Sequence, residues 1–177
     1  MKNTPSNQEF KAFVEKQVSK HILHYFKHVP RTDDKIITFL KSHLLIEQQL
    51  IKLINIELKK PEALSDSRLT FHQILCLAES LHWYKKDDWV WIGIRQLNKI
   101  RNSLSHKLEP KNLERDINHF LRLIERKCPQ RVKEGLRGQA NSRLTLTIGL
   151  LYSYISGYLE ACINTKIREQ HKENNLV

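Results

Sequence analysis

The stretch WVWIGIRQLNKIRNSLSH, residues 89–106, decides the fold. Within it Leu97, Ile100 and Leu104 recur three or four positions apart, and Leu108 continues the series. On an α-helix this spacing places all four side chains on one narrow face. Such a face has to be covered by neighbouring helices, so the stretch predicts a helix packed into a bundle.

The rest of the chain predicts the neighbouring helices. Only five Gly and five Pro occur in 177 residues, and 40% of the residues are hydrophobic, which favours helices joined by short connections. Thr70 and Gln73 have the spacing of a capping box at a helix start. We expect one all-α domain over residues 1–177, an up-and-down bundle of five to six helices. Its parts are an N-terminal helix in 1–30, a core with the motif helix in 31–127, a basic loop in 128–141 and a C-terminal helix in 142–171.

The C-terminal helix contains the most apolar run of the chain, residues 144–163. Because Thr, Ser and Glu residues interrupt the run, we interpret it as a buried helix and expect no membrane span. Gly149, Ser153, Ser156 and Gly157 permit the close approach of another helix. The sequence leaves open whether that helix belongs to this chain or to a second copy.

Charge and cysteine content indicate the partner and the compartment. Thirty Lys and Arg against nineteen Asp and Glu give a net charge of +11, which favours a polyanionic partner, nucleic acid ahead of an acidic membrane or protein. The three cysteines are far apart and odd in number, so we expect a reducing cytoplasm and no disulfide framework.

Three histidines, His21, His24 and His28, share one face of the predicted first helix and could in principle bind a metal. No cysteine, carboxylate or fourth histidine lies nearby in the sequence to complete the ligand set. A solvated or partner-facing stripe is therefore favoured, and we expect no metal and no cofactor.

The end of the opening stretch, Arg101 to His106, combines residue types suited to phosphodiester chemistry. An arginine holds a phosphate through its two-pronged guanidinium, and a histidine moves a proton near neutral pH. On a helix Asn102 and His106 share a face, and Arg101 needs its length to join them. One exposed helix face does not enclose a substrate, so we expect a second copy to complete a cleft in which a histidine deprotonates a ribose 2′-hydroxyl. Arg101 would stabilise the phosphate charge without a metal.

Basic residues flank this motif. Lys99, Lys107 and Lys111 are candidate RNA-binding residues that would follow a phosphate backbone. Ordinary solvated helix faces are the alternative interpretation. The same choice stays open for the basic loop between Arg126 and Arg137, which is either solvated or in contact with RNA.

The Arg101-Asn102-x-x-x-His106 pattern, on a later helix of a small basic helical domain, resembles the Rx4-6H motif of HEPN-domain proteins. The resemblance implies a homodimer with its cleft at the interface and metal-independent endoribonuclease activity in toxin–antitoxin or antiviral defence systems. It implies Arg101 and His106 as the catalytic pair and Asn102 as the residue that orients them. Leu108 stands where members paired with nucleotidyltransferase antitoxins have a tyrosine, so modification at that position is not expected.

Two other functions remain open. The sequence around the Arg101–His106 motif also resembles mannitol-repressor-like relatives of the same group. That resemblance implies a non-catalytic dimer that binds nucleic acid, an antitoxin or another protein of a defence complex. Alternatively, the chain is a plain helical interaction protein. In that case His106 only stabilises the C-terminal end of its helix, where positive charge complements the helix dipole.

Overall fold

The computed structural model of the chain describes residues 7–29, 34–82, 88–106, 110–137 and 142–174. Every regular element in these ranges is an α-helix, which confirms the predicted all-α class. Along the described chain the helices are α1 (Asn7–His28), α2 (Lys35–Glu57), α3 (Glu62–Ser65), α4 (Phe71–Leu81), α5 (Asp88–His106), α6 (Leu113–Lys127), α7 (Pro129–Arg137) and α8 (Arg143–Asn174).

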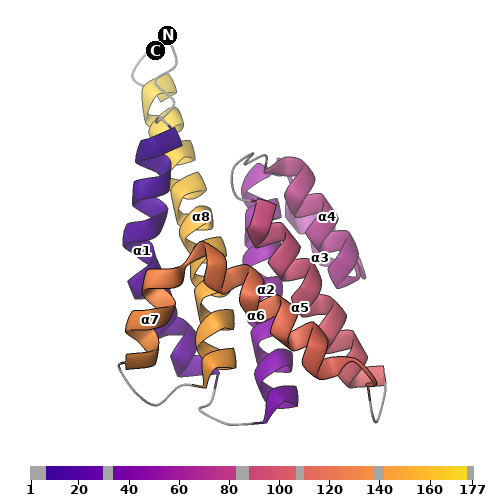
Figure 1. The fold of residues 1–177 in the computed structure, drawn as a ribbon. Coiled ribbons are helices and arrows are strands. Elements are labelled where there is room, and N and C mark those ends of the chain that lie inside the picture. The colour runs from indigo at the N-terminus through magenta and orange to yellow at the C-terminus, as the bar shows by residue number, and fades with distance from the viewer. Residues whose placement is uncertain (1–6, 30–33, 83–87, 107–109, 138–141, 175–177) are drawn as a thin grey trace.

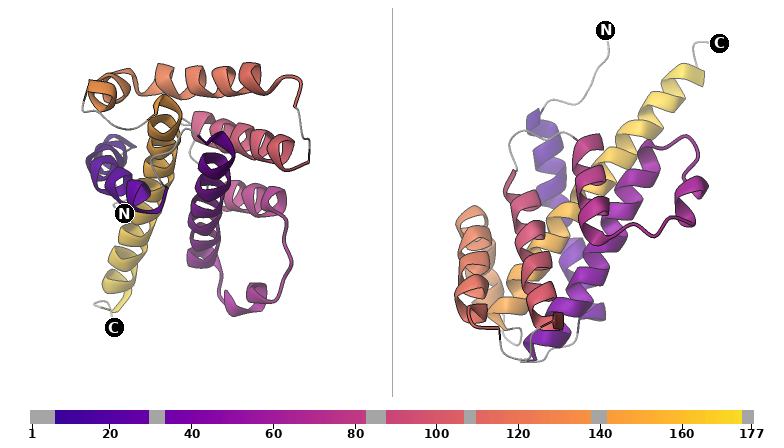
Figure 2. Two further views of the ribbon diagram at one scale, coloured as in Figure 1. Left: turned by 90° about the horizontal axis from the view of Figure 1, so that it is seen from below. Right: turned by 90° about the vertical axis from the view of Figure 1, so that its right-hand side faces the viewer.

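The helices form two groups that meet along α8 (Figure 1). In the first group α1 and α8 lie side by side and antiparallel. In the second group α2 packs against α4 and α5, and it also packs against α8. Helix α6 packs on α5 and reaches α8, where α7 joins it (Figure 2). The motif helix α5 therefore has α2 and α4 on one side and α6 on the other.

The core confirms the buried stripe predicted for α5. Leu97 is completely buried, Ile100 is almost completely buried, and Leu104 packs against the core from its edge. Leu108 lies outside the described residues. Leu97 and Ile100 belong to one core cluster with fully buried residues of α2 and α8, among them Leu50 and Leu151, because each of these helices also buries one apolar face.

Helix α4 begins with the predicted capping box. The Gln73 backbone N–H donates to Thr70 Oγ1 at 3.4 Å, and the Thr70 backbone N–H donates to Gln73 Oε1 at 2.8 Å. The backbone N–H groups of Thr70 and Gln73 have no carbonyl partner within the helix, and each is satisfied by the side chain of the other residue. The cap places Phe71, the first helical residue, against the core beside the motif helix.

Two predictions about the connections are wrong. The described residues form eight helices, more than the expected five to six, because α3 and α7 were expected to be irregular. Most of the predicted basic loop 128–141 is helix α7. Pro129 is tolerated in the first turn of a helix, and Val132 is buried, so the packing of this apolar side chain favours the helical form of the basic segment.

The small residues of α8 face a helix of the same chain. A Cβ atom added at Gly149 would lie 2.8 Å from Tyr25 Cδ1, and one added at Gly157 would lie 3.1 Å from the Val14 carbonyl oxygen. Both neighbours belong to α1, so α1 makes the close approach that the sequence left unassigned. This face of α8 is consequently occupied and unavailable to a second copy.

We expect Gly149→Ala to lower the free energy of unfolding by about 1–2 kcal/mol. The added methyl group would clash with Tyr25, whose ring is buried and whose hydroxyl bonds Ser42 Oγ at 2.7 Å, and the gain of about 1 kcal/mol in helix propensity offsets only part of this. Urea denaturation measures the change. Gly93→Ala is the matched control, because the nearest atoms to its added Cβ are the ends of two side chains, Leu151 Cδ1 at 3.2 Å and Ile124 Cδ1 at 3.9 Å. Equal stabilisation by both substitutions would contradict the packing described for Gly149.

Helix α8 is also the one helix in the described part of the chain that is long and apolar enough to cross a membrane by length and composition alone. Its most apolar 18-residue window has a mean hydropathy of 1.2, and 72% of that window is buried inside the fold. The burial confirms the prediction that this run forms a buried helix.

Candidate functional site

Asn102 and His106 leave α5 on the side away from its buried stripe, whereas Arg101 borders the stripe. Leu97 and Ile100 point into the core, so the same helical turns present Asn102 and His106 to solvent, with Arg101 half-buried between the two environments. The predicted order of faces around the helix is therefore confirmed.

Arg101 and Asn102 are in direct contact. Arg101 Nη1 donates a hydrogen bond to Asn102 Oδ1 at 3.0 Å, so the long side chain bends back along its own helix. Arg101 Nε is shielded from solvent and has no hydrogen-bond partner within the described part of the chain. A buried donor without a partner costs free energy, and a turn of the side chain that exposes Nε to an incoming anion would recover that cost.

His106 lies at the end of α5 and is exposed. Helical geometry separates it from Arg101 by about 140° around the axis and about 7.5 Å along it, whereas Asn102 is only about 40° from His106. Within one copy Asn102 therefore links the two: it bonds Arg101 and shares a face with His106. The chain does not by itself bring the guanidinium and the imidazole together.

A fourth residue, His43 of α2, stands behind the motif and was not foreseen from the sequence. It is only 4% exposed, its Nε2 donates to Asn98 Oδ1 of α5 at 3.1 Å, and its ring lies 3.9 Å, between centroids, from the ring of Phe71 of α4. The signal was present, since Ser42 and His43 are two polar residues inside an apolar helix. The role of His43 depends on its contacts with α4 and α5, and no local sequence pattern places those helices beside α2.

The charge of Arg101 acts on two residues of α2. Burial lowers the pKa of His43; the hydrogen bond to Asn98 opposes this, and the positive charge of Arg101 lowers the pKa further. Burial raises the pKa of Glu47, and Arg101 acts in the opposite direction. Glu47 is half-buried one helical turn from His43. Arg101 is thus close enough to both residues for its charge to lower the pKa of each at the junction of α2 and α5.

The lowered pKa of buried His43 is expected to make the fold less stable in acid. Below about pH 6.5 a histidine of the unfolded chain binds a proton while buried His43 resists it, so the free energy of unfolding falls as the pH falls. Urea denaturation between about pH 8 and pH 5 measures the slope. His43→Gln keeps a donor for Asn98 and should flatten it. His21, whose pKa is also lowered by burial, is separate, so His21→Gln should remove another part of the slope. An unchanged slope in His43→Gln would contradict this assignment.

The predicted RNA-binding lysines lie in different surroundings. Lys99 is 70% exposed and its Nζ is 3.4 Å from Asp116 Oδ2 of α6. Lys111 is exposed just before α6, and Lys107 lies outside the described residues. The structure therefore brings Lys99 toward α6 and does not gather the three lysines into one described site.

The histidines of α1 do not converge as a ligand set. His21 Nε2 is 2.9 Å from Glu160 Oε2 of α8, and His24 contacts His28 with ring centroids 4.6 Å apart. Among the described residues no group of three His, Cys, Asp or Glu side chains is placed to hold a metal ion. The His21 contact instead joins α1 to α8, together with Lys20, whose Nζ is 3.1 Å from Glu160 Oε1.

Comparison of this chain with models of protein families, with curated proteins and with solved structures found no match. The site is accordingly interpreted from its own residues and from the resemblance of its motif.

Proposed function

We propose that this chain is a metal-independent endoribonuclease of the HEPN type, active as a homodimer in which two copies of the motif line one cleft. The observation that carries the proposal is the state of Arg101. Its guanidinium is held by Asn102, its Nε lacks a hydrogen-bond partner among the described residues, and it lies on the helix whose exposed end is His106. This arrangement suits a phosphate beside a proton-transfer group.

The proposed reaction is an internal phosphoryl transfer. His106 takes the proton of a ribose 2′-hydroxyl, and the 2′-oxygen attacks the adjacent phosphorus. The bond from phosphorus to the 5′-oxygen breaks, and that oxygen receives a proton from His106 of the partner subunit. The products are a 2′,3′-cyclic phosphate and a 5′-hydroxyl. Arg101 stabilises the charge that grows on the phosphate oxygens, and Asn102 keeps the guanidinium oriented.

An apolar stripe on α2 is our candidate for the dimer contact. Ile37, Leu44 and Ile51 are exposed and recur every seven residues, so they share one face of α2. The same helix carries His43 and Glu47, the residues affected by Arg101. Burial of this stripe by a second copy would remove apolar surface from water, the contribution that a stable dimer needs.

Leu44→Glu is expected to convert the dimer to monomer and to abolish RNA cleavage. Leu44 is 57% exposed, so the substitution costs the folded monomer little, but it would bury a carboxylate in the contact. Light scattering gives the mass of the particle, and a cleavage assay gives the activity. Leu23→Glu on α1 is the matched control, because Leu23 is also an exposed leucine. A Leu44→Glu protein that remains a dimer would place the contact elsewhere.

The reaction itself is tested with purified protein and RNA in the presence of EDTA. The expected result is cleavage with 2′,3′-cyclic phosphate ends, because no step of the proposed mechanism uses a metal. Loss of cleavage on chelation, or ends that carry a 3′-hydroxyl, would refute the mechanism.

A second candidate function is favoured by the same α2 stripe. Exposed apolar residues at regular spacing also suit a different protein, so a non-catalytic dimer that binds an antitoxin, another defence-complex protein or nucleic acid is the alternative. It would bind RNA in a salt-sensitive manner without turnover. For the ribonuclease we propose a cytoplasmic toxin or defence role, which expression in a bacterial host would reveal as arrested growth and degraded RNA.

A further inference from the structure

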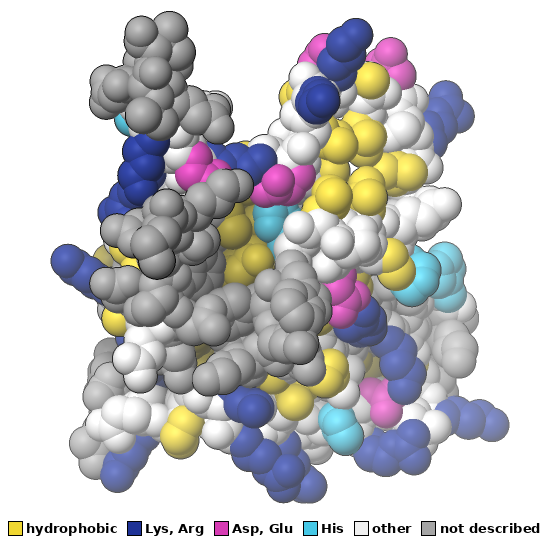
Figure 3. Space-filling view, turned by 90° about the horizontal axis from the view of Figure 1, so that it is seen from above, with side chains coloured by type: hydrophobic (Ala, Val, Ile, Leu, Met, Phe, Trp, Pro, Cys, Tyr) yellow, Lys and Arg dark blue, Asp and Glu magenta, His cyan; other side chains and the backbone are white. Residues whose placement is uncertain are grey.

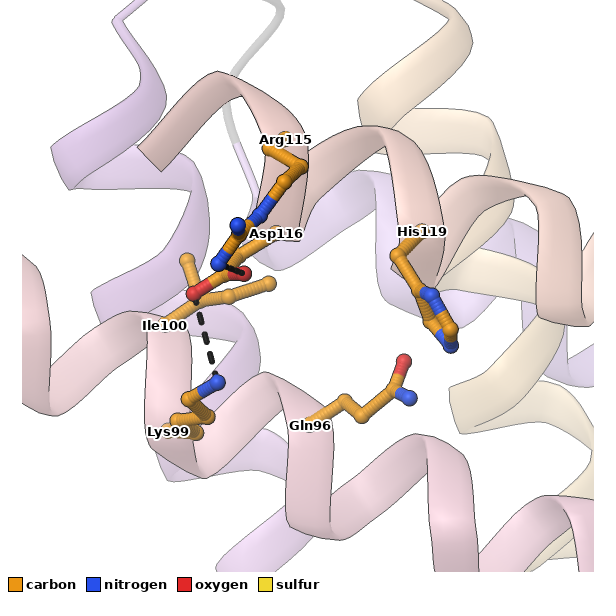
Figure 4. A pocket seen from close by; sticks show the side chains of 6 residues that line it. All are labelled: Gln96, Lys99, Ile100, Arg115, Asp116 and His119. Carbon is orange, nitrogen blue, oxygen red and sulfur yellow. Dashed lines mark ion pairs between the residues drawn. The ribbon is translucent and has the colours of Figure 1, made fainter. Parts of the chain in front are cut away.

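A cleft of about 310 Å³ lies between α5 and α6, on the side of α5 away from α2 (Figure 4). It belongs neither to the Arg101 contact nor to the His43 cluster. Ile100, which is almost completely buried, forms its apolar base. The polar residues that line it are Gln96 and Lys99 from α5 and Arg115, Asp116 and His119 from α6.

One end of the cleft presents an amide and an imidazole. The Gln96 amide and the His119 ring point toward one another across the opening (Figure 4). Gln96 Oε1 is shielded from solvent and has no hydrogen-bond partner within the described part of the chain. A buried acceptor without a partner costs free energy, and a turn of the half-buried Gln96 side chain toward the opening would let it receive a donor from a bound molecule. The exposed His119 ring offers that molecule an aromatic surface.

The other end of the cleft is positively charged. Lys99 Nζ and Arg115 Nη2 lie 3.4 Å and 3.7 Å from the two oxygens of Asp116, so two cations share one carboxylate. Both distances exceed a good charge-assisted hydrogen bond, and both cations are at least 70% exposed. Exposed pairs of this kind contribute little to stability, so either cation can turn to a phosphate.

The positive charge continues along α6. Arg115, His119, Arg122 and Arg126 are exposed and follow one another at helical spacing on one face. Figure 3, in which α6 lies along the lower edge, shows Lys and Arg side chains gathered there. This stripe would attract a polyanion and direct it into the cleft.

The cleft also adjoins the motif. Lys99 and His106 are seven residues apart on α5, which places them on nearly the same face and about 10.5 Å apart along the axis. A strand with its phosphate at His106 can therefore pass on to Lys99 and Arg115 of the same copy.

We propose that this cleft binds a nucleotide of the RNA strand that flanks the scissile phosphate, and that it selects a base carrying an exocyclic amino group. Gln96 Oε1 accepts from the exocyclic amino group that projects from the edge of adenine, cytosine or guanine. Uracil carries a carbonyl oxygen at the position of the cytosine amino group, and its one base donor, the ring N3–H, does not project in this way. The His119 ring stacks on the base, and Lys99 and Arg115 hold its phosphate. The identity of the ligand as RNA rests on the proposed function, but the binding does not require cleavage.

The test measures binding of the wild-type chain to short fluorescent 2′-O-methyl oligo(A) and oligo(U), which the proposed mechanism does not cleave because their 2′-oxygens are blocked. We expect tighter binding of oligo(A), by about tenfold, the discrimination of one good amide–base pair. Gln96→Leu should remove the preference. Gln170→Leu is the matched control, because Gln170 is an exposed glutamine on α8, away from both the cleft and the α2 stripe, and it should keep the preference.

The exposed Arg115 supplies a second variant that does not depend on a buried residue. Arg115→Ala should weaken the binding of both oligonucleotides equally. It should also reduce the slope of the binding constant against salt concentration by about one released counterion. Equal binding of oligo(A) and oligo(U) by the wild type, or an unchanged preference in Gln96→Leu, would overturn the proposal. A preference that depends on Gln96, in a protein that cleaves no RNA, would support the cleft and refute the ribonuclease.

Discussion

His106→Ala is expected to slow RNA cleavage by about 10²–10⁴-fold, the contribution of a positioned general acid or base. The effect should be large because the homodimer loses two imidazoles, the one that deprotonates the 2′-hydroxyl and the one that protonates the leaving oxygen. Binding of RNA should change little, since an exposed imidazole at a helix end contributes little to strand affinity. Single-turnover cleavage of an end-labelled RNA measures the rate of the chemical step.

His72→Ala is the matched control, because His72 is an exposed histidine on α4. It should cleave like the wild type. If His106→Ala retains full activity and changes the free energy of unfolding by only about 1 kcal/mol or less, His106 is a structural residue at the end of its helix. That outcome would leave the plain interaction protein as the best description.

Arg101→Ala is expected to lower the cleavage rate by about 10²–10³-fold, as the loss of one strong transition-state donor does in other acyl- and phosphoryl-transfer sites. Arg101→Lys keeps the charge but loses the planar fork, so it should recover only part of this. Asn102→Ala removes the acceptor that holds the fork at 3.0 Å and should have a smaller effect. The rate at saturating RNA separates these effects from weaker binding.

The double variant distinguishes positioning from independent catalysis. If Asn102 acts by orienting Arg101, adding Asn102→Ala to Arg101→Ala should cost nothing further. Circular dichroism and urea denaturation show whether the fold is retained. This control is needed because Arg101→Ala also leaves Glu47 half-buried without the nearby positive charge. Wild-type rates in a well-folded Arg101→Ala protein would contradict the proposed mechanism.

Local patterns predicted much of the fold. The spacing of Leu97, Ile100 and Leu104 predicted which face of α5 is buried, and the Thr70–Gln73 pair predicted where α4 begins. Both succeed because they depend on contacts within one or two helical turns. The same patterns failed at α7. Pro129 and Gly135 suggest an irregular segment, but Val132 is buried in the packed fold, and that burial is decided outside the segment.

The sequence by itself determined that the chain is helical and basic. The spacing of Arg101, Asn102 and His106 also determined that their helix does not carry them on its buried stripe. Only the tertiary structure brought His43 to Asn98, 55 positions away, or set Gln96 opposite His119 across a cleft. It also decided that α1 occupies the small residues of α8. The physical reason is the same in each case. Periodicity specifies which face of a helix is apolar, whereas the choice of the helix that covers it comes from packing among all the faces at once.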